Sequence, residues 1–475
     1  MHQPWHLIVQ IGYLSIFLFI AIGIRRFIPF VRKFRIPDAI VAGFLALIAG
    51  QGVFKILEID LKLMTALVYH FMAIGFIALS LKGEERKGVV RSAISGSLYI
   101  VISYAIQGIV GLGITIIFIN TLYPNLFPSF GFLLPFGFAQ GPGLAGGMGA
   151  EWETIKLANG NSAFPNGASI GFSFSTIGFL WACFVGVPLM NYFVRRRQKK
   201  MAKGKNFQLK PAPFLVERER DYSSMARSVD KMTTQFILIF LIYIILRVGL
   251  IGITKLLGIV LPGSLGQNMA SMFWGFQFGF GALMGTFIGK LIRKLESVGF
   301  IKGKITSNYI LQHIGGTAID FMIAASIAAI DIHVFVAYIF PIFVVTTVGG
   351  ITVILYTWFF VKTFWANTFV EHFVAFFGMH TGTISTGMAL LRGVDPNFKT
   401  SAATDMIYGS GIALILGIPL IFLAGFPAYG FVTNQPNLYW ITLLLCFAYA
   451  LVILFIWFSS PIRRFFTKYT GEGSK

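Results

Sequence analysis

The chain has 475 residues, of which 56% are hydrophobic and 12% are charged, and its formal net charge is +20. A soluble domain carries roughly twice this share of charged residues, so this composition, with a mean hydropathy of +0.77, indicates an integral membrane protein. The positive charge does not indicate nucleic-acid binding, because the lysines and arginines lie in loops between apolar runs and not on one face of a domain.

The apolar runs predict eleven membrane-crossing helices, because each approaches or exceeds the roughly 20 residues that cross a bilayer. In chain order the predicted helices span about 7–24, 36–54, 63–81, 93–119, 169–193, 234–253, 269–288, 305–329, 334–361, 403–423 and 438–458. The polar segment 195–232 is predicted to be a cytoplasmic linker between two halves of the chain.

Two regions, 126–167 and 369–399, do not fit a simple crossing helix. The stretch Phe138–Trp152 in the first region holds five glycines and a proline, which disfavour a stable helix in lipid. Residues 378–387 in the second region are rich in glycine and hydroxyl groups. Non-helical backbone at membrane depth occurs only where protein buries it or where it lines a wet cavity. We therefore predict two re-entrant hairpins, the first with its tip at Gly141–Gly147.

The distribution of positive charge supports this arrangement. With the N-terminus outside and both hairpins re-entrant, the cytoplasmic loops and the C-terminal tail hold 33 of the 38 lysines and arginines, as the positive-inside rule expects. A full crossing by either hairpin would reverse every later loop. The predicted fold is thus an all-α inverted repeat of five helices and one re-entrant hairpin per half, with one extra helix. Its parts are 1–194, the linker 195–232, 233–425 and 426–475, and the chain is expected to cross the membrane many times with its C-terminus in the cytoplasm.

Inverted repeats whose broken elements meet at the bilayer midplane are typical of secondary transporters. Helix N-termini in such elements favour a carboxylate, and carbonyl and hydroxyl oxygens suit sodium. The candidate substrate-binding residues are Gln140, Gly141, Gly143, Gly146, Gly147, His380, Thr381, Gly382, Thr383, Ser385, Thr386 and Arg392. The candidate sodium-binding residues are Thr383, Thr386, Asp320 and Asp405.

Each of these candidates also has a purely structural alternative. Gly141–Gly143 could form a surface turn, the hydroxyls could bond to helix carbonyls, and His380 could be a polar packing residue. Asp320 could carry a proton or pair with Arg247 or His313, Asp405 could cap a helix, and Arg392 could lie in a cytoplasmic loop. Glu371 and His372 are expected at the membrane interface.

Several motifs resemble those of the bacterial sodium/glutamate symporter family. They are Lys33–Asp38 followed by Val41–Gly43, Ala73–Phe76, Gln107–Gly111, Ser175–Gly178, Gly186–Pro188 and Phe321–Ser326, and the resemblance covers about residues 30–425. The hairpin tips match the family pattern more loosely: Glu151 stands where a small residue is expected, and Leu391 and Arg392 stand where the family has other residues.

The resemblance implies sodium-coupled import of glutamate or a similar anionic amino acid. It also implies an elevator-type movement, a homodimer in the lipid bilayer, and no cofactor beyond sodium as the coupling ion. The alternatives are a di- or tricarboxylate symporter coupled to sodium or protons, a channel, or a membrane protein without transport. An enzyme is not expected, because the sequence offers neither a nucleophile with a base nor a metal-binding cluster.

Overall fold

The computed structural model describes residues 3–50, 54–82, 90–202, 225–261, 264–301, 303–396 and 398–459. Within these residues every regular element is a helix, apart from one isolated β-bridge between Lys156 and Ser162. Most of the predicted linker, part of the basic loop after residue 82 and the C-terminal tail lie outside the described residues.

The first half of the chain contains α1 (Gln3–Phe27), α2 (Pro29–Lys33), α3 (Asp38–Ala49), α4 (Leu61–Leu81), α5 (Val90–Asn120), η1 (Pro128–Phe132), η2 (Pro135–Ala139), α6 (Pro142–Thr154), α7 (Gly167–Trp181), η3 (Ala182–Gly186) and α8 (Val187–Ala202). The second half contains α9 (Met225–Val260), α10 (Ser264–Gly275), α11 (Gln277–Ser297), α12 (Asn308–Ala328), α13 (Ile332–Ala337), α14 (Ile339–Phe364), η4 (Ala366–Thr368), α15 (Phe369–His380), α16 (Ile384–Val394), α17 (Ala402–Leu416), α18 (Ile418–Val432) and α19 (Asn437–Phe458).

Eight helices in the described residues are long and apolar enough to cross a membrane, and the bent pair α17–α18 would make a ninth. The sequence predicted eleven. The described residues of the segment predicted as 36–54 include the 12-residue helix α3, which ends at Ala49 and is followed by the extended residue Gly50. The segment 269–288 is divided at Phe276 between α10 and α11. The segment 403–423 bends by 49° after Leu416 and continues to Val432.

The break between α10 and α11 lies where α10 packs closely against α6. A Cβ atom at Gly275 would lie 2.4 Å from the sulfur of Met148 on α6, so the absence of a side chain lets α6 approach the end of α10. A helix that ends at this point leaves Phe276 free to turn toward the centre of the molecule, where its side chain is buried.

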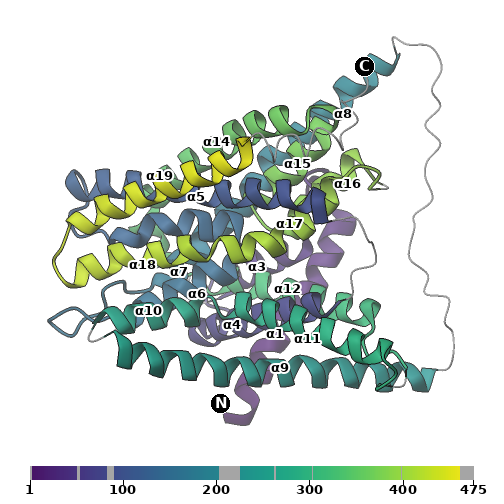
Figure 1. Cartoon of the computed structure of the whole chain (residues 1–475), viewed down its shortest axis with the longest axis horizontal. Coiled ribbons are helices and arrows are strands. Elements are labelled where there is room, and N and C mark those ends of the chain that lie inside the picture. Colours follow the sequence, from purple (N-terminus) through teal and green to yellow (C-terminus); the bar gives the residue numbers. More distant parts are fainter. Residues whose placement is uncertain are drawn as a thin grey trace.

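The helices form two groups with α6 and α7 between them. In Figure 1, α9 and α11 lie along one edge and α14 and α19 along the opposite edge. In the first group α4 packs against α12, α3 packs against α12, and α11 packs against α4. In the second group α5 packs against α14, α17 and α19. Thus α3 of the first half packs on α12 of the second half, and α11 of the second half packs on α4 of the first half. We call this arrangement reciprocal packing.

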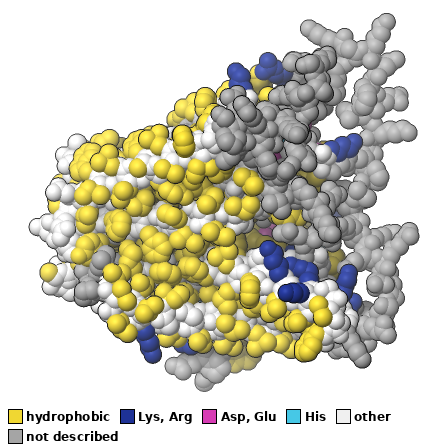
Figure 2. Space-filling model, in the orientation of Figure 1, with side chains coloured by type: hydrophobic (Ala, Val, Ile, Leu, Met, Phe, Trp, Pro, Cys, Tyr) yellow, Lys and Arg dark blue, Asp and Glu magenta, His cyan; other side chains and the backbone are white. Residues whose placement is uncertain are grey.

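The surface agrees with a membrane environment. Large apolar side chains are exposed along α1, α9, α14 and α19. Figure 2 shows hydrophobic side chains covering most of the visible face, with most of the visible Lys and Arg side chains near its right-hand end. An apolar belt with basic residues at one end is the distribution that a bilayer selects.

Candidate functional site: two hairpin tips

The first hairpin consists of η1 and η2, a turn at Gln140–Gly141, and α6. Its two limbs run antiparallel, because the ring of Phe127, just before η1, lies 5.4 Å from the ring of Trp152 near the end of α6. Gly141 has φ +84°, a backbone conformation that other residues rarely adopt. The sharp reversal of the chain therefore depends on this glycine.

The prediction that the glycine-rich stretch is not helical was wrong, because α6 runs from Pro142 to Thr154. Its glycines serve close packing. Cβ atoms at Gly143 and Gly146 would lie 1.6 Å from the sulfur of Met72 and 1.9 Å from the ring of Phe172. Burial between α4 and α7 thus compensates for the low intrinsic helix propensity of glycine, and the tip is much shorter than Gly141–Gly147.

The second hairpin consists of α15, a turn at Thr381–Thr383, and α16, and its limbs pack directly against each other. A Cβ atom at Gly387 would lie 2.5 Å from the carbonyl oxygen of Ala375, so glycine permits this contact too. The Thr383 hydroxyl accepts a hydrogen bond from the Thr386 amide at 3.4 Å and caps α16. The Thr381 hydroxyl donates to the carbonyl of Phe377 at 2.8 Å.

As expected, the two tips face each other. A Cβ atom at Gly141 would lie 3.0 Å from Thr383 Cγ2 and 3.7 Å from the Gly382 carbonyl oxygen. Gly141 and Thr383 are the N-cap residues of α6 and α16, so two helix N-termini converge here. The ends of η2 and α15 lie at the same tips. The junction therefore offers positive helix ends for an anion and carbonyl oxygens for a cation.

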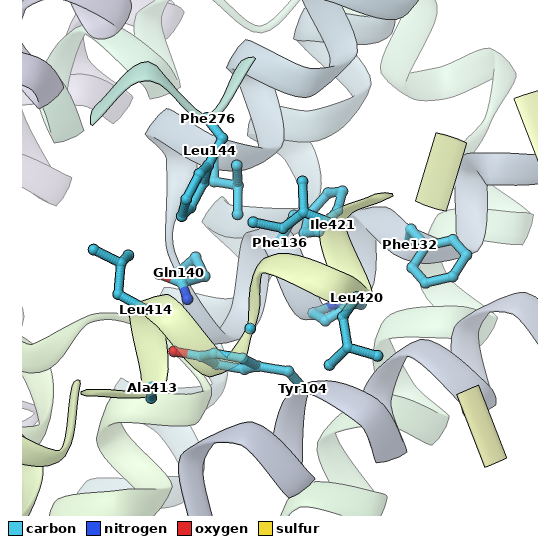
Figure 3. A pocket seen from close by; sticks show the side chains of 12 residues that line it. Tyr104, Phe132, Phe136, Gln140, Leu144, Phe276, Ala413, Leu414, Leu420 and Ile421 are labelled. Atoms are coloured by element: carbon cyan, nitrogen blue, oxygen red, sulfur yellow. The ribbon is translucent and has the colours of Figure 1, made fainter. Parts of the chain in front are cut away.

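A small cavity opens beside the first tip (Figure 3). Its volume of about 20 Å³ holds roughly one water molecule, so a larger ligand requires the surrounding elements to move apart. Gln140 and Tyr104 supply its polar side chains, and the amide nitrogen of Gln140 points toward Tyr104 in Figure 3. The other lining residues are Phe132, Pro135, Phe136, Leu144, Phe276, Ala413, Leu414, Gly417, Leu420 and Ile421. The cavity thus borders the breaks between α10 and α11 and between α17 and α18.

Comparison with known protein families identifies the family of this chain. The family model described as sodium/glutamate symporter matches residues 7–398, which include both hairpin tips. The chain belongs to the sodium/glutamate symporter family. A search of curated proteins found no match. The sequence-based resemblance to this family is confirmed, and the protein is a transporter.

In this symporter the side chain of His380, at the end of α15, is fully buried. Neither of its ring nitrogens has a hydrogen-bond partner. Its ring is surrounded by those of Tyr99, Tyr104 and Tyr356, at centroid distances of 5.3, 6.0 and 6.4 Å. A buried polar group left without a partner typically costs about 1–3 kcal/mol of folding free energy. The burial of His380 therefore lowers the stability of the folded protein.

Gln107 is a second buried polar residue in the same region. Its Nε2 donates to the Tyr356 hydroxyl at 2.9 Å, whereas its Oε1 has no hydrogen-bond partner. In the sequence, Gln107 stands out only as part of a family motif, and the three tyrosines were missed. Tyr104 and Gln107 lie three residues apart on predicted helix, which places them on one face, but nothing in the sequence directs that face toward His380.

The base of the second hairpin holds a buried polar network around Asp405, in the first turn of α17. One oxygen of Asp405 lies 3.0 Å from each of three groups: Nε2 of His372, the Trp365 indole nitrogen and the Ser401 hydroxyl. His372 also contacts the Thr368 carbonyl through Nδ1. The side chains of Glu371 and His372, the two residues expected at the membrane interface, are both buried within the protein. The network joins α15 to α17.

Three other predicted site residues have exposed side chains. Arg392 is exposed near the end of α16, and its guanidinium lies 5.7 Å from the ring centre of Phe398. Ser385 is also exposed. Asp320 lies on an exposed part of α12, and its charged neighbours are Asp38 and Arg25, not Arg247 or His313.

Cation binding by carboxylate or imidazole clusters has little support in the part of the chain that the structure describes. No group of three or more His, Cys, Asp or Glu side chains there is arranged to hold a metal ion. Thr383 and Thr386, whose hydroxyl oxygens lie 3.3 Å apart, are the candidates that lie at the tips.

Proposed function

We propose that this protein is a sodium-coupled symporter that imports glutamate or a similar anionic amino acid. The observation that carries the proposal is the convergence of the N-termini of α6 and α16 at Gly141 and Thr383. A Cβ atom added at Gly141 would lie 3.0 Å from Thr383 Cγ2. Unpaired amide groups and the positive helix ends favour a carboxylate. An anionic substrate would be held between the tips, with Gln140, Gly141 and residues 381–383 closest to it.

Sodium is proposed to bind at the same junction, where the C-terminal, negatively polarised ends of two helical elements lie. The C-terminal ends of η2 and α15 direct carbonyl oxygens toward the tips, and the hydroxyls of Thr383 and Thr386 lie beside them. Oxygen ligands of this kind suit a hard cation. Sodium bound here would reduce repulsion between substrate carboxylates and the carbonyls, so each ligand would favour binding of the other.

Alternating access is proposed to follow an elevator-type movement of the hairpins and their supporting helices against the group that contains α4, α11 and α12. The reciprocal packing of α3 on α12 and α11 on α4 supports an inverted repeat, and the antiparallel limbs of both elements support re-entrant hairpins. The breaks at Phe276 and Gly417 border the cavity and provide places where the two groups could separate. A homodimer in the inner membrane, with the N-terminus outside, completes the proposal.

The test is uptake of labelled L-glutamate by proteoliposomes with and without an inward sodium gradient. We expect saturable uptake that requires sodium. Gly141→Ala should abolish it, because the new methyl group would contact Thr383 Cγ2 at 3.0 Å and the backbone has φ +84°.

Gly160→Ala is the matched control. Gly160 has φ +81°, but a Cβ there would meet nothing within 4 Å. The two substitutions therefore impose similar backbone strain, and only the first disturbs the contact between the tips. Equal loss in both variants would contradict the proposed role of the tips, and absence of sodium-dependent uptake of any carboxylate by the wild type would contradict the symporter function.

A further inference from the structure

We propose that Gln107 and His380 form a subsite, behind Tyr104, that binds the ammonium group of an amino-acid substrate. This inference rests on the proposed function and names the substrate class more narrowly. The convergent helix N-termini attract carboxylates, but they do not distinguish an amino acid from a plain dicarboxylate. A transporter for amino acids needs a separate group that recognises the positive end of the zwitterion.

The unpaired atoms of the subsite have the chemistry that an ammonium group requires. Gln107 Oε1 is buried and has no hydrogen-bond partner, and an amide oxygen is only an acceptor. A neutral imidazole has one nitrogen with a free lone pair, and both nitrogens of His380 are unpartnered. An ammonium group, with three donors and no acceptor, suits both the Gln107 amide oxygen and the lone-pair nitrogen of His380.

The surrounding rings add to this preference. Tyr99, Tyr104 and Tyr356 enclose His380, with ring centroids 5.3–6.4 Å from its own. Tyrosine rings attract cations placed over their faces within about 6 Å.

The subsite is also placed to communicate with the tips. His380 directly precedes the turn at Thr381–Thr383, whose last residue faces Gly141. Tyr104 contacts the His380 ring on one side and lines the cavity beside Gln140 on the other. In Figure 3 its ring closes the side of the cavity opposite Phe276 and Leu144. Movement of the Tyr104 ring would therefore join the cavity to the unpaired atoms of Gln107 and His380.

The experiment compares L-glutamate with glutarate, which has the same two carboxylates and lacks the amino group. Full-length protein is reconstituted in proteoliposomes with an inward sodium gradient, and unlabelled glutarate competes with labelled L-glutamate. For the wild type we expect the glutarate inhibition constant to exceed the glutamate KM at least about tenfold, the effect of one lost hydrogen bond to a charged group.

Gln107→Leu and His380→Phe should each raise the glutamate KM about tenfold and leave the glutarate inhibition constant unchanged. Gln10→Leu is the matched control for Gln107, because Gln10 is also a fully buried glutamine but lies on α1, where its Nε2 donates to the Glu58 carbonyl. His313→Phe, at an exposed position of α12, controls for the histidine replacement. His380→Gln retains a hydrogen-bond acceptor and should recover part of the preference for glutamate.

Variants without uptake are examined by the rise in Tm that each ligand produces in detergent. A selective loss of the glutamate effect, with the glutarate effect retained, supports the subsite. Equal inhibition by glutamate and glutarate in the wild type would overturn the subsite alone, as would an equal weakening of both ligands in the variants. Absence of any wild-type uptake would instead overturn the proposed function, and the subsite with it.

Discussion

The two hairpins meet at their tips but are held in place by different interactions. The first is held by backbone contacts that glycine makes possible: Cβ atoms at Gly149 and Gly171 would lie 2.1 and 2.2 Å from carbonyl oxygens of the opposite helix. The second is held at its base by the hydrogen bonds of Asp405 with His372 and Trp365. One hairpin thus depends on shape and the other on buried polar groups.

This difference suggests a division of labour. Close backbone packing of α6 on α7 leaves little room for adjustment, because protein interiors respond to even one additional methyl group. The second hairpin has fewer contacts of this kind and carries His380, whose ring nitrogens are unpaired. We therefore expect the first hairpin to act as a rigid wall and the second to supply most of the polar recognition. Three substitutions test this comparison.

The largest expected effect is that of Asp405→Ala, which leaves the buried donors of His372 and Trp365 without their acceptor. Each buried donor left without an acceptor typically costs about 1–3 kcal/mol, and this substitution leaves at least two. Thermal unfolding in detergent should show a large fall in Tm. Asp331→Ala is the control, because this half-buried aspartate caps the short helix α13 and its loss should cost about 1 kcal/mol. Similar falls in Tm would show that the network does not anchor the hairpin.

Gly149→Ala should have an intermediate effect on the first hairpin. The new methyl group would lie 2.1 Å from the Gly167 carbonyl oxygen, and backbone at both sides must move, at about 1–3 kcal/mol. Gly113→Ala on α5 is the matched control, because a Cβ there would meet nothing within 4 Å. If Gly149→Ala leaves Tm as unchanged as the control does, the first hairpin is not held by close backbone packing.

Thr383→Ala should have the smallest effect on stability. It removes the hydroxyl that caps α16 by accepting from the Thr386 amide, and loss of such a cap costs about 1 kcal/mol. Thr383→Ser retains the hydroxyl and should keep the wild-type Tm. A serine variant as unstable as the alanine variant would show that the methyl group of Thr383, packed near Gly141, matters more than the cap.

Some of the site was predictable because its signals are local. Proline, glycine and hydroxyl residues mark the turns at Gln140–Gly141 and Thr381–Thr383 wherever the chain folds. The extent of the first tip was not predictable, since glycine in a helix is unfavourable alone and becomes favourable only where Met72 and Phe172 occupy the space. The burial of His372 was missed for the same reason: its partner Asp405 is 33 residues away.

The sequence by itself determined the membrane environment, the family, two broken regions and the residue types at both tips. These follow from composition, from the positions of charges and from local backbone preferences. Only the tertiary structure decided that α3 is short, that α10 and α11 are separate, that the N-termini of α6 and α16 converge, and that Gln107 lies with His380 among three tyrosines. Those features depend on contacts between distant segments, and the free energy of such contacts outweighs local preference.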